Sequence, residues 1–447
     1  MRRRWVRLQG TFWFVPAVLG VAAVVLAQLL VALDRWLLDR GIGIGGSLLY
    51  HVGASGSRDI LGAIGGSMLG VAATSFSITI SVLATASSTY GPRLVRNFMA
   101  DRGNQVVLGI FGATFLYALM VLRSIRSLDS DGDVFVPDIA VNVAVLLAVL
   151  DVGVLVYFIH HIAQSIQVAT LSSRVRDELS AAVDELYPTE PPPDAASDSE
   201  VTLPEHVDTV RAPRSGVVVD VDEDAALSSA VDADAVVVLL CRPGEHVIEG
   251  DAIAEFRRWS GSASASHLRE IESAVEIGDE RTPQHDIEFA VEQLAEMAVR
   301  ALSSGTNDPY TARNALDDLS VGMATLVGRP PPCGARTDDA GTVRIVLRRV
   351  PVVDLIDHAL GAVRIYAMAS PMVVAAGIRM AERLGAAATA TASIDRVRHH
   401  LDLLDEACRR EMTDPAGRAS CLDQIDRARG RLLTVAVSGS PSGTVES

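Results

Sequence analysis

Four long apolar segments dominate the first 170 residues of the chain. They run over residues 12–33, 60–83, 106–122 and 139–162. Each is close to the ~20 residues that an α-helix needs to cross the hydrocarbon core of a bilayer. Because backbone polar groups in lipid must be satisfied within the segment itself, apolar segments of this length are restricted to helices. The sequence therefore predicts a four-span transmembrane domain over residues 1–170.

The first apolar segment follows a cluster of four arginines, which is also how a secretory signal peptide begins. A signal peptide has a shorter apolar core and small residues at its cleavage site. Here the apolar run is long and ends at Asp34, Arg35 and Trp36. We therefore expect a first helix that stays in the mature protein.

Arginines also set the expected orientation of the four spans. The N-terminal cluster and the group Arg93, Arg96 and Arg102, between the second and third segments, belong on the cytoplasmic side by the positive-inside rule. Arg123 and Arg126 fall on the opposite side and count against this topology. The prediction is a multi-pass protein with both termini in the cytoplasm.

The two parts of the chain differ in charge. Residues 1–170 contain 12 Arg and 9 Asp, a net +3, and the remainder contains 27 Arg and 46 acidic residues, a net −19, which together give −16. An acidic soluble part repels phosphates, so we expect no nucleic-acid partner. All 39 basic residues are Arg, which excludes a Walker-type phosphate loop and a Schiff-base, lipoyl or biotinyl lysine. The four cysteines lack the spacing of a disulfide framework or a zinc site, and we predict no metal and no cofactor.

The second apolar segment carries a ridge of glycines followed by hydroxyl side chains. Gly62, Gly66 and Gly70 lie four residues apart, which places them on one helix face and permits close approach of another helix. Serines and threonines follow, including Ser77 and Ser81, and each hydroxyl needs a partner in hydrocarbon. The pattern is typical of tight helix packing, within one chain or in a homo-oligomer, and also of a helix that lines a polar path.

The fourth segment contains two polar side chains, Asn142 and Asp151. A carboxyl group at the depth of Asp151 is costly unless it faces the helix bundle or a water-filled cavity. Two roles stay open for it, proton or cation handling and a hydrogen-bonded structural group. The segment ends with His160 and His161, which point about 100° apart on a helix and form a poor metal pair. We expect an interface role for them.

Residues 171–447 are predicted to form a cytosolic α+β part. A polar helix and a Pro-rich acidic linker cover residues 171–204. Short β-branched runs between Gly, Pro and Asp turns predict a small all-β domain at residues 205–262, whose hairpins resemble those of biotinyl/lipoyl-like barrels. A mostly helical domain follows at residues 263–437, with a strand at 342–350 that can join the barrel. Residues 438–447 are predicted to be a disordered tail.

The helical domain contains a break between two predicted helices. Apolar positions between Asp286 and Leu302 have helical spacing. Asp308 followed by Pro309 is typical of a helix N-cap and first helical position. The functional alternative is an anion held at this helix N-terminus with the help of Arg313.

Three motifs together resemble one protein family. They are SSTYGPRLVRNFMADRGNQVVLGIF at residues 87–111, FIHHIAQSIQ at 158–167 and HDIEFAVEQLAEMAVRALSSGTNDPYTA at 285–312. They resemble the bacterial predicted membrane proteins grouped as "domain of unknown function 2254", except that Ser-Ser-Gly stands where Ser-Pro-Gly is expected. The resemblance implies this architecture and a bacterial inner-membrane location, and it supplies no catalytic residues. The positions that match its motifs include Arg93, Asp101, Gln105, His160, Asp286, Asn307 and Asp308.

Two functions follow from these patterns. The first is an oligomeric ion channel or transporter whose cytosolic part regulates it. The second is a membrane-anchored sensor or scaffold without a pore. It is favoured by the predicted barrel at residues 205–262, which lacks a lysine for modification and resembles a docking domain. No GxSxG, HExxH or glycine-rich dinucleotide motif is present, so the sequence does not indicate an enzyme. The predicted partners are the lipid bilayer and further copies of the chain, and the sequence names no small ligand or ion.

Overall fold

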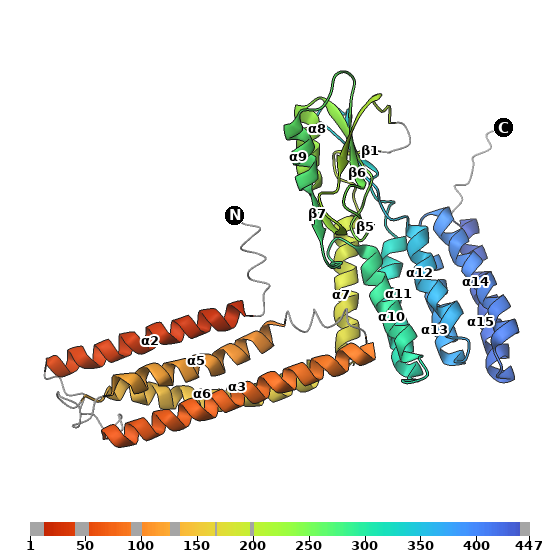
Figure 1. The fold of residues 1–447 in the computed structure, drawn as a ribbon. Helices are drawn as coiled ribbons and strands as arrows, with labels where there is room; N and C mark the ends of the chain where they lie inside the picture. The colour runs from red at the N-terminus through yellow and green to blue at the C-terminus, as the bar shows by residue number, and fades with distance from the viewer. Residues whose placement is uncertain are drawn as a thin grey trace, which may run out of the picture. The chain divides into compact units, whose positions relative to one another are not determined.

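A computed structural model of the chain describes residues 13–40, 53–90, 101–125, 135–165, 168–196 and 201–438. Its contacts divide the chain into two compact units (Figure 1). Unit 1 is Met1–Thr170 and unit 2 is Leu171–Ser447. The finer domain boundaries within residues 171–447 stay a prediction.

Unit 1 contains four helices that are long and apolar enough to cross a membrane. They are α2 (Phe14–Asp39), α3 (Ala54–Tyr90), α5 (Arg102–Ser124) and α6 (Asp138–Ser165). The helix α5 packs against each of the other three, and Figure 1 shows the four lying side by side. The structure thus confirms the four apolar helices that the sequence predicted.

Two apolar clusters hold the four helices together, one toward each end of the bundle. The larger cluster has twelve buried residues, which come from α2, α3, α5 and α6 and from the ends of α5 and α6. They are Ala23, Ala27, Val31, Leu61, Tyr117, Ala118, Val121, Ile125, Phe135, Ala140, Val141 and Ala144. Within it the Tyr117 hydroxyl donates to the Ala140 carbonyl oxygen at 2.9 Å, so the buried ring satisfies its polar atom. The smaller cluster consists of Val107, Phe111, Phe158 and Ile162.

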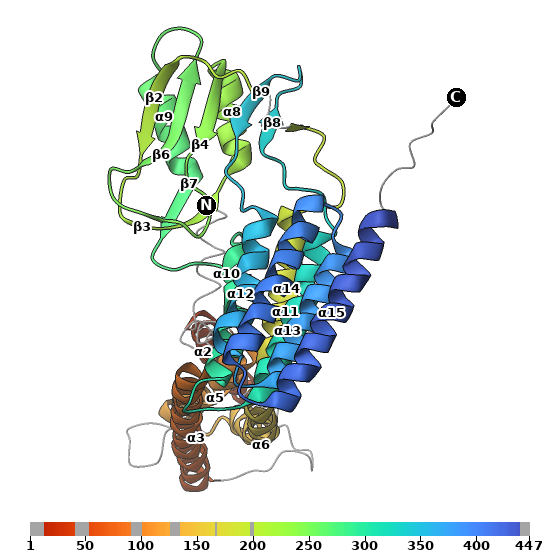
Figure 2. The same cartoon turned by 90° about the vertical axis from the view of Figure 1, so that its right-hand side faces the viewer.

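A six-stranded sheet in unit 2 has the strand order β1-β8-β9-β4-β6-β2 (Figure 2). The pair β4 and β9 is parallel, and the other neighbours are antiparallel. A three-stranded antiparallel sheet has the order β5-β3-β7. The strands are β1 (Ala195–Ala196), β2 (His206–Arg211), β3 (Gly216–Val221), β4 (Ala235–Leu239), β5 (His246–Val247), β6 (Ala252–Arg258), β7 (Val275–Gly278), β8 (Ala335–Thr337) and β9 (Val343–Val346).

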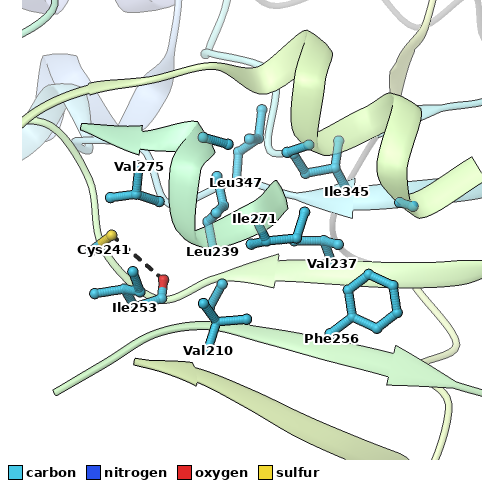
Figure 3. Packing of buried hydrophobic residues seen from close by; sticks show 14 of the residues in the cluster. Val210, Val237, Leu239, Cys241, Ile253, Phe256, Ile271, Val275, Ile345 and Leu347 are labelled. Carbon is cyan, nitrogen blue, oxygen red and sulfur yellow. Dashed lines mark hydrogen bonds between the residues drawn. The ribbon is translucent and has the colours of Figure 1, made fainter. Parts of the chain in front are cut away.

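Two short helices, α8 (Glu223–Asp232) and α9 (Ala265–Ala274), share one apolar core with these sheets. Figure 3 shows Ile271 of α9 in the cluster that also holds Val237 of β4, Phe256 of β6 and Ile345 of β9. Strands far apart in the sequence therefore contribute to a single core. The strand predicted at residues 342–350 does join this sheet, beside β4.

The prediction of an all-β domain at residues 205–262 is wrong, because the segment contains α8. Asp222 caps this helix by accepting a hydrogen bond from the Ala225 amide at 3.1 Å, and Ala226 and Ala230, one turn apart, are fully buried. The β-branched runs on either side hid this short Ala- and Ser-rich helix. The observed sheets give no support to a biotinyl/lipoyl-like barrel. The strand β1, moreover, lies inside the predicted linker.

The rest of unit 2 is helical, as predicted. Its helices are α7 (Val168–Leu186), α10 (Ile287–Ala301), α11 (Pro309–Val327), α12 (Val352–Tyr366), α13 (Pro371–Ala387), α14 (Thr391–Glu411) and α15 (Pro415–Ser438). Figure 2 shows α10 to α15 packed along one another. Of the predicted disordered tail, Ser438 ends α15 and residues 439–447 lie outside the described residues.

Candidate functional site

The glycine ridge of α3 faces away from the other described helices of the chain. Gly62, Gly66 and Gly70 are exposed, and a Cβ atom added at any of them would meet no described atom within 4 Å. The α3 glycine that packs inside is Gly65, whose added Cβ would lie 3.8 Å from the Phe115 ring. The ridge is therefore open to a helix from outside the described part of this chain.

Hydroxyl side chains of α3 divide between two faces. Ser77 and Ser81 are exposed, and Ser77 follows Gly66 by about three helical turns, so it lies on the ridge side. Ser75 and Thr79 are buried, and the Thr79 hydroxyl donates to the Ser75 carbonyl oxygen at 2.8 Å. The sequence singled out the exposed pair and missed the buried one, because periodicity does not tell which face of α3 meets α5.

Asp151 lies in the middle of α6 and is only 2% exposed. Neither of its carboxylate oxygens has a hydrogen-bond partner among the described residues. The side chain of Thr114 of α5, also buried, interacts with this carboxylate, and no described group makes a closer hydrogen bond to it. Asn142 is half-buried, and its side-chain amide donates to the Asp138 carbonyl oxygen at 2.8 Å. The structure therefore supports a structural role for Asn142 and shows none for Asp151.

Two motifs that are 60 residues apart meet at one end of unit 1. Asp101 caps α5 by accepting a hydrogen bond from the Gly103 amide at 2.8 Å, and its second oxygen lies 3.1 Å from Nε2 of His161. His160 is exposed, so the residue that makes this contact is its neighbour in the sequence. The polar pair links the start of α5 to the end of α6.

Two amide side chains lie buried within a turn of this pair. Gln105 is 2% exposed and Asn104 is fully buried. Neither side-chain amide atom of Asn104 has a hydrogen-bond partner among the described residues. A buried amide of this kind is costly, so Asn104 marks a place where a water or another polar group fits. Arg93, the remaining motif position in unit 1, lies outside the described residues.

Asp34 of α2 is a buried carboxylate that sequence reasoning did not select as a site. Its two oxygens accept hydrogen bonds from the amides of Ile139 and Ala140, both at 3.1 Å. These amides lie at the N-terminus of α6, where negative charge is favourable. Asp34 thus fixes α2 to the end of α6 that lies opposite Asp101. No sequence signal connects this carboxylate to a helix start 105 residues later.

Asp286, a motif position in unit 2, is satisfied within the chain. It is 3% exposed and accepts a hydrogen bond from the Phe289 amide at 3.0 Å as the N-cap of α10. The Arg281 guanidinium donates to both carboxylate oxygens, at 2.6 and 2.9 Å. Gly244, with φ +92°, lies so close that an added Cβ would collide with the carboxylate. These contacts indicate a structural role.

Asn307 and Asp308 shape the turn between α10 and α11. Asn307 has a φ of +46°, in the left-handed region that Asn tolerates. Asp308 is the N-cap of α11, as predicted, and accepts hydrogen bonds from the amides of Tyr310 and Thr311 at 3.1 Å each. The Thr311 hydroxyl donates to it at 2.6 Å, which lowers the pKa of Asp308. A carboxylate already occupies this helix N-terminus and opposes an anion there.

The helix α7 is anchored to α11 within unit 2. Arg176 pairs with Asp318 at 3.1 Å, and the Ser172 hydroxyl donates to the same carboxylate. One turn further, Leu179 packs directly against Gly322, where an added Cβ would collide with it. Because α7 begins three residues after α6 ends, it is the element of unit 2 nearest in sequence to the fourth span.

Comparison with known proteins agrees with this architecture. Four apolar spans and a mixed helical and sheet unit define a polytopic membrane protein. The chain belongs to the family described as "Predicted membrane protein (DUF2254)", whose family model matches residues 9–383. Two uncharacterized proteins, from Mycobacterium bovis and Mycobacterium tuberculosis, are each 30% identical over 429 residues, which cover 94% of this chain and 80% of the relative. No solved structure matches the chain.

Proposed function

We propose that the protein is an oligomeric ion channel or transporter of the bacterial inner membrane, with unit 2 as its cytosolic regulatory part. The observation that carries the proposal is the open face of α3. Three exposed glycines and the exposed hydroxyls of Ser77 and Ser81 share this face of an apolar, membrane-length helix. No described residue of the same chain covers the glycines.

Lipid gives no physical reason to keep such a face. Each glycine costs about 1 kcal/mol of helix propensity relative to Ala. A second helix that approaches closely along Gly62, Gly66 and Gly70 gains dispersion contacts that offset this cost. Where the face continues through Ser77 and Ser81, the hydroxyls of several copies together supply a polar lining that one helix alone does not. Four spans are few for a carrier acting alone, which is a second reason to favour an assembly.

The alternative function is a membrane-anchored sensor or scaffold without a pore. It is supported by the extensive contact of α5 with α2, α3 and α6, because a bundle built around a central helix leaves its interior filled with side chains. In this case the α3 face would still associate with a second copy, but nothing would cross the membrane. Oligomerisation alone therefore does not distinguish the two functions, whereas ion flux does.

The experiment combines flux and assembly on the full-length protein in liposomes. Wild type, Gly66→Ile and the matched variant Gly153→Ile are compared, because Gly153 on α6 is also exposed with no described atom near an added Cβ. We expect the wild type to conduct ions and to run as an oligomer in detergent. Gly66→Ile should run as a smaller folded species with reduced flux, and Gly153→Ile should resemble the wild type.

The outcomes separate the hypotheses. If the wild type is an oligomer and shows no flux for any ion tested, the channel or transporter hypothesis is refuted and the scaffold hypothesis is supported. A monomeric wild type, or an unchanged oligomer in Gly66→Ile, would refute assembly through α3. Reporter fusions after Leu186 and at Gly132 test the orientation, since the first should be cytosolic and the second external.

A further inference from the structure

Among the described residues of unit 1, two polar layers lie between α5 and α6, and the first contains Asp151. Asp151 and Thr114 are each 2% exposed and come from the neighbouring, antiparallel helices α6 and α5. Among the described residues Asp151 has no ion pair, and the Thr114 hydroxyl is the one side-chain group that interacts with its carboxylate. A carboxylate buried in this way is unstable as an anion, while its protonated form is far cheaper to bury. The first layer is therefore a place where a cation is favoured.

The second polar layer lies nearer one end of the same two helices. It consists of the Asp101–His161 contact and the buried amide of Asn104. Asn104 precedes Thr114 by ten residues and His161 follows Asp151 by ten residues, so the two layers are about 15 Å apart along both helices. His161 is partly exposed, with 21% of its side chain accessible, and it stacks on Tyr157. The second layer thus reaches the surface of unit 1, whereas the first does not.

A thin apolar layer separates the two polar ones. Val107 and Phe111 lie between Asn104 and Thr114 on α5, and Phe158 lies between Asp151 and His161 on α6. With Ile162 they form the smaller apolar cluster. Toward the opposite end, Asp151 is closed off by the larger cluster of twelve buried residues, in which Tyr117 is tied to Ala140. The shorter way to water from Asp151 therefore passes Phe111 and Phe158.

The donor set at Asp151 selects the kind of cation. A metal ion such as Mg²⁺ or Ca²⁺ takes about six or more oxygen ligands, and the described residues contain no group of three or more metal-binding side chains. One carboxylate and one hydroxyl are too few for such an ion, whereas a proton requires a single oxygen. Among the described residues, the ionisable groups on the Asp101 side are Asp101 itself, Arg102, Tyr157, His160 and His161. Those on the other side include Tyr117 of α5, Asp138 of α6 and Asp34 of α2.

We propose that Asp151 binds and releases a proton, which it exchanges with the Asp101–His161 end of the bundle when Phe111 and Phe158 move apart. In the loading step a hydronium ion at the second layer gives its proton to a carboxylate oxygen of Asp151, an O–H bond forms there, and water is left behind. Release is the reverse. The two phenylalanines act as an apolar constriction that keeps water out when closed. This inference rests on the proposed function only in one part: net transfer of the proton across the membrane requires transport, whereas binding and release at Asp151 do not.

Infrared difference spectroscopy on the full-length protein tests the site without any need for flux. The wild type should show a protonated-carboxyl band that Asp151→Asn removes and Asp34→Asn keeps. Transfer to D2O should shift this band at a rate set by water access. We expect faster exchange in Phe158→Ala and an unchanged rate in Phe135→Ala, because Phe135 belongs to the larger cluster at the other end. If Phe158→Ala does not fold, Phe158→Leu is used in its place.

The outcomes also distinguish this inference from the transport proposal. Absence of a band that depends on Asp151 at any pH would overturn the proton site. Equal exchange rates in Phe158→Ala and Phe135→Ala would overturn the route. A band and exchange rates as expected, in liposomes that show no proton flux under a potassium diffusion potential, would uphold the site and refute transport of protons. Proton flux that Asp151→Asn leaves unchanged would uphold transport and overturn the inference.

Discussion

Replacing Asp286 by Ala should destabilise unit 2 more than any comparable change of a surface carboxylate. The substitution removes two charged hydrogen bonds from Arg281 and the cap on the Phe289 amide. The carboxylate side chain is 2% exposed and the Arg281 side chain 19%, so the guanidinium left behind is largely shielded from water. The main source of the cost is a largely buried guanidinium that has lost its closest partner.

The size of the effect follows from what Arg281 retains. Breaking a buried ion pair by removing one partner costs about 3–5 kcal/mol. Arg281 keeps its contact with Glu292 at 2.9 Å, which offsets part of that loss. We therefore expect a destabilisation of about 3 kcal/mol, at the lower end of the range. This corresponds to roughly a hundredfold change in the folding equilibrium of unit 2.

Pulse proteolysis in urea measures this change in the full-length protein, because it reports the unfolded fraction of the accessible unit. Asp279→Ala is the matched control, since Asp279 also pairs with an arginine, at 3.1 Å, but is 90% exposed. Its effect should stay within about 0.5 kcal/mol. If Asp286→Ala lowers the urea midpoint no more than Asp279→Ala does, the structural role assigned to Asp286 is wrong.

Three further predictions concern unit 2. Burial lowers the pKa of His400 from its usual 6.5 despite the hydrogen bond to Asp357, so its contribution to stability is present above pH 6.5 and is lost as the pH falls. His400→Gln should reduce this acid dependence of the unfolding curves, and an unchanged dependence would contradict the prediction. Gly322→Ala should lower the free energy of unfolding by about 1–3 kcal/mol because its methyl group overlaps Leu179, whereas Gly430→Ala, at an open position, should not. Burial raises the pKa of the Cys241 and Cys408 thiols to about 11, so timed alkylation and mass spectrometry should find half-buried Cys333 modified first, and equal rates would refute this.

The sequence predicted the elements whose signal is local. Length and apolarity were enough for the four spans, and Asp308 before Pro309 marked the start of α11. The short helix α8 was missed because its ten residues lie between β-branched strands and bury only small side chains such as Ala226 and Ala230. A pattern that short cannot be separated from a turn by periodicity alone.

The candidate site depended on contacts that a single sequence does not contain. Asp151 was found because a carboxyl group inside an apolar span is unusual in itself. From the sequence we selected Ser77 and His160, whereas the side chains that lie inside the bundle or contact α5 are those of Ser75 and His161. To separate them one must know which helix face meets α5. Asp34 looked like the polar end of a span, and its role as a cap for α6 appears only when the two helices are packed together.

Cysteine cross-linking in native membranes tests the central claim most directly, that the open face of α3 joins two copies of the chain. Ser77→Cys places a thiol on this face, and Leu146→Cys places one on α6 at a position 58% exposed. With the wild type as background for the four native cysteines, mild oxidation should convert Ser77→Cys to a covalent dimer and leave Leu146→Cys monomeric. A dimer from Leu146→Cys and none from Ser77→Cys would contradict the account.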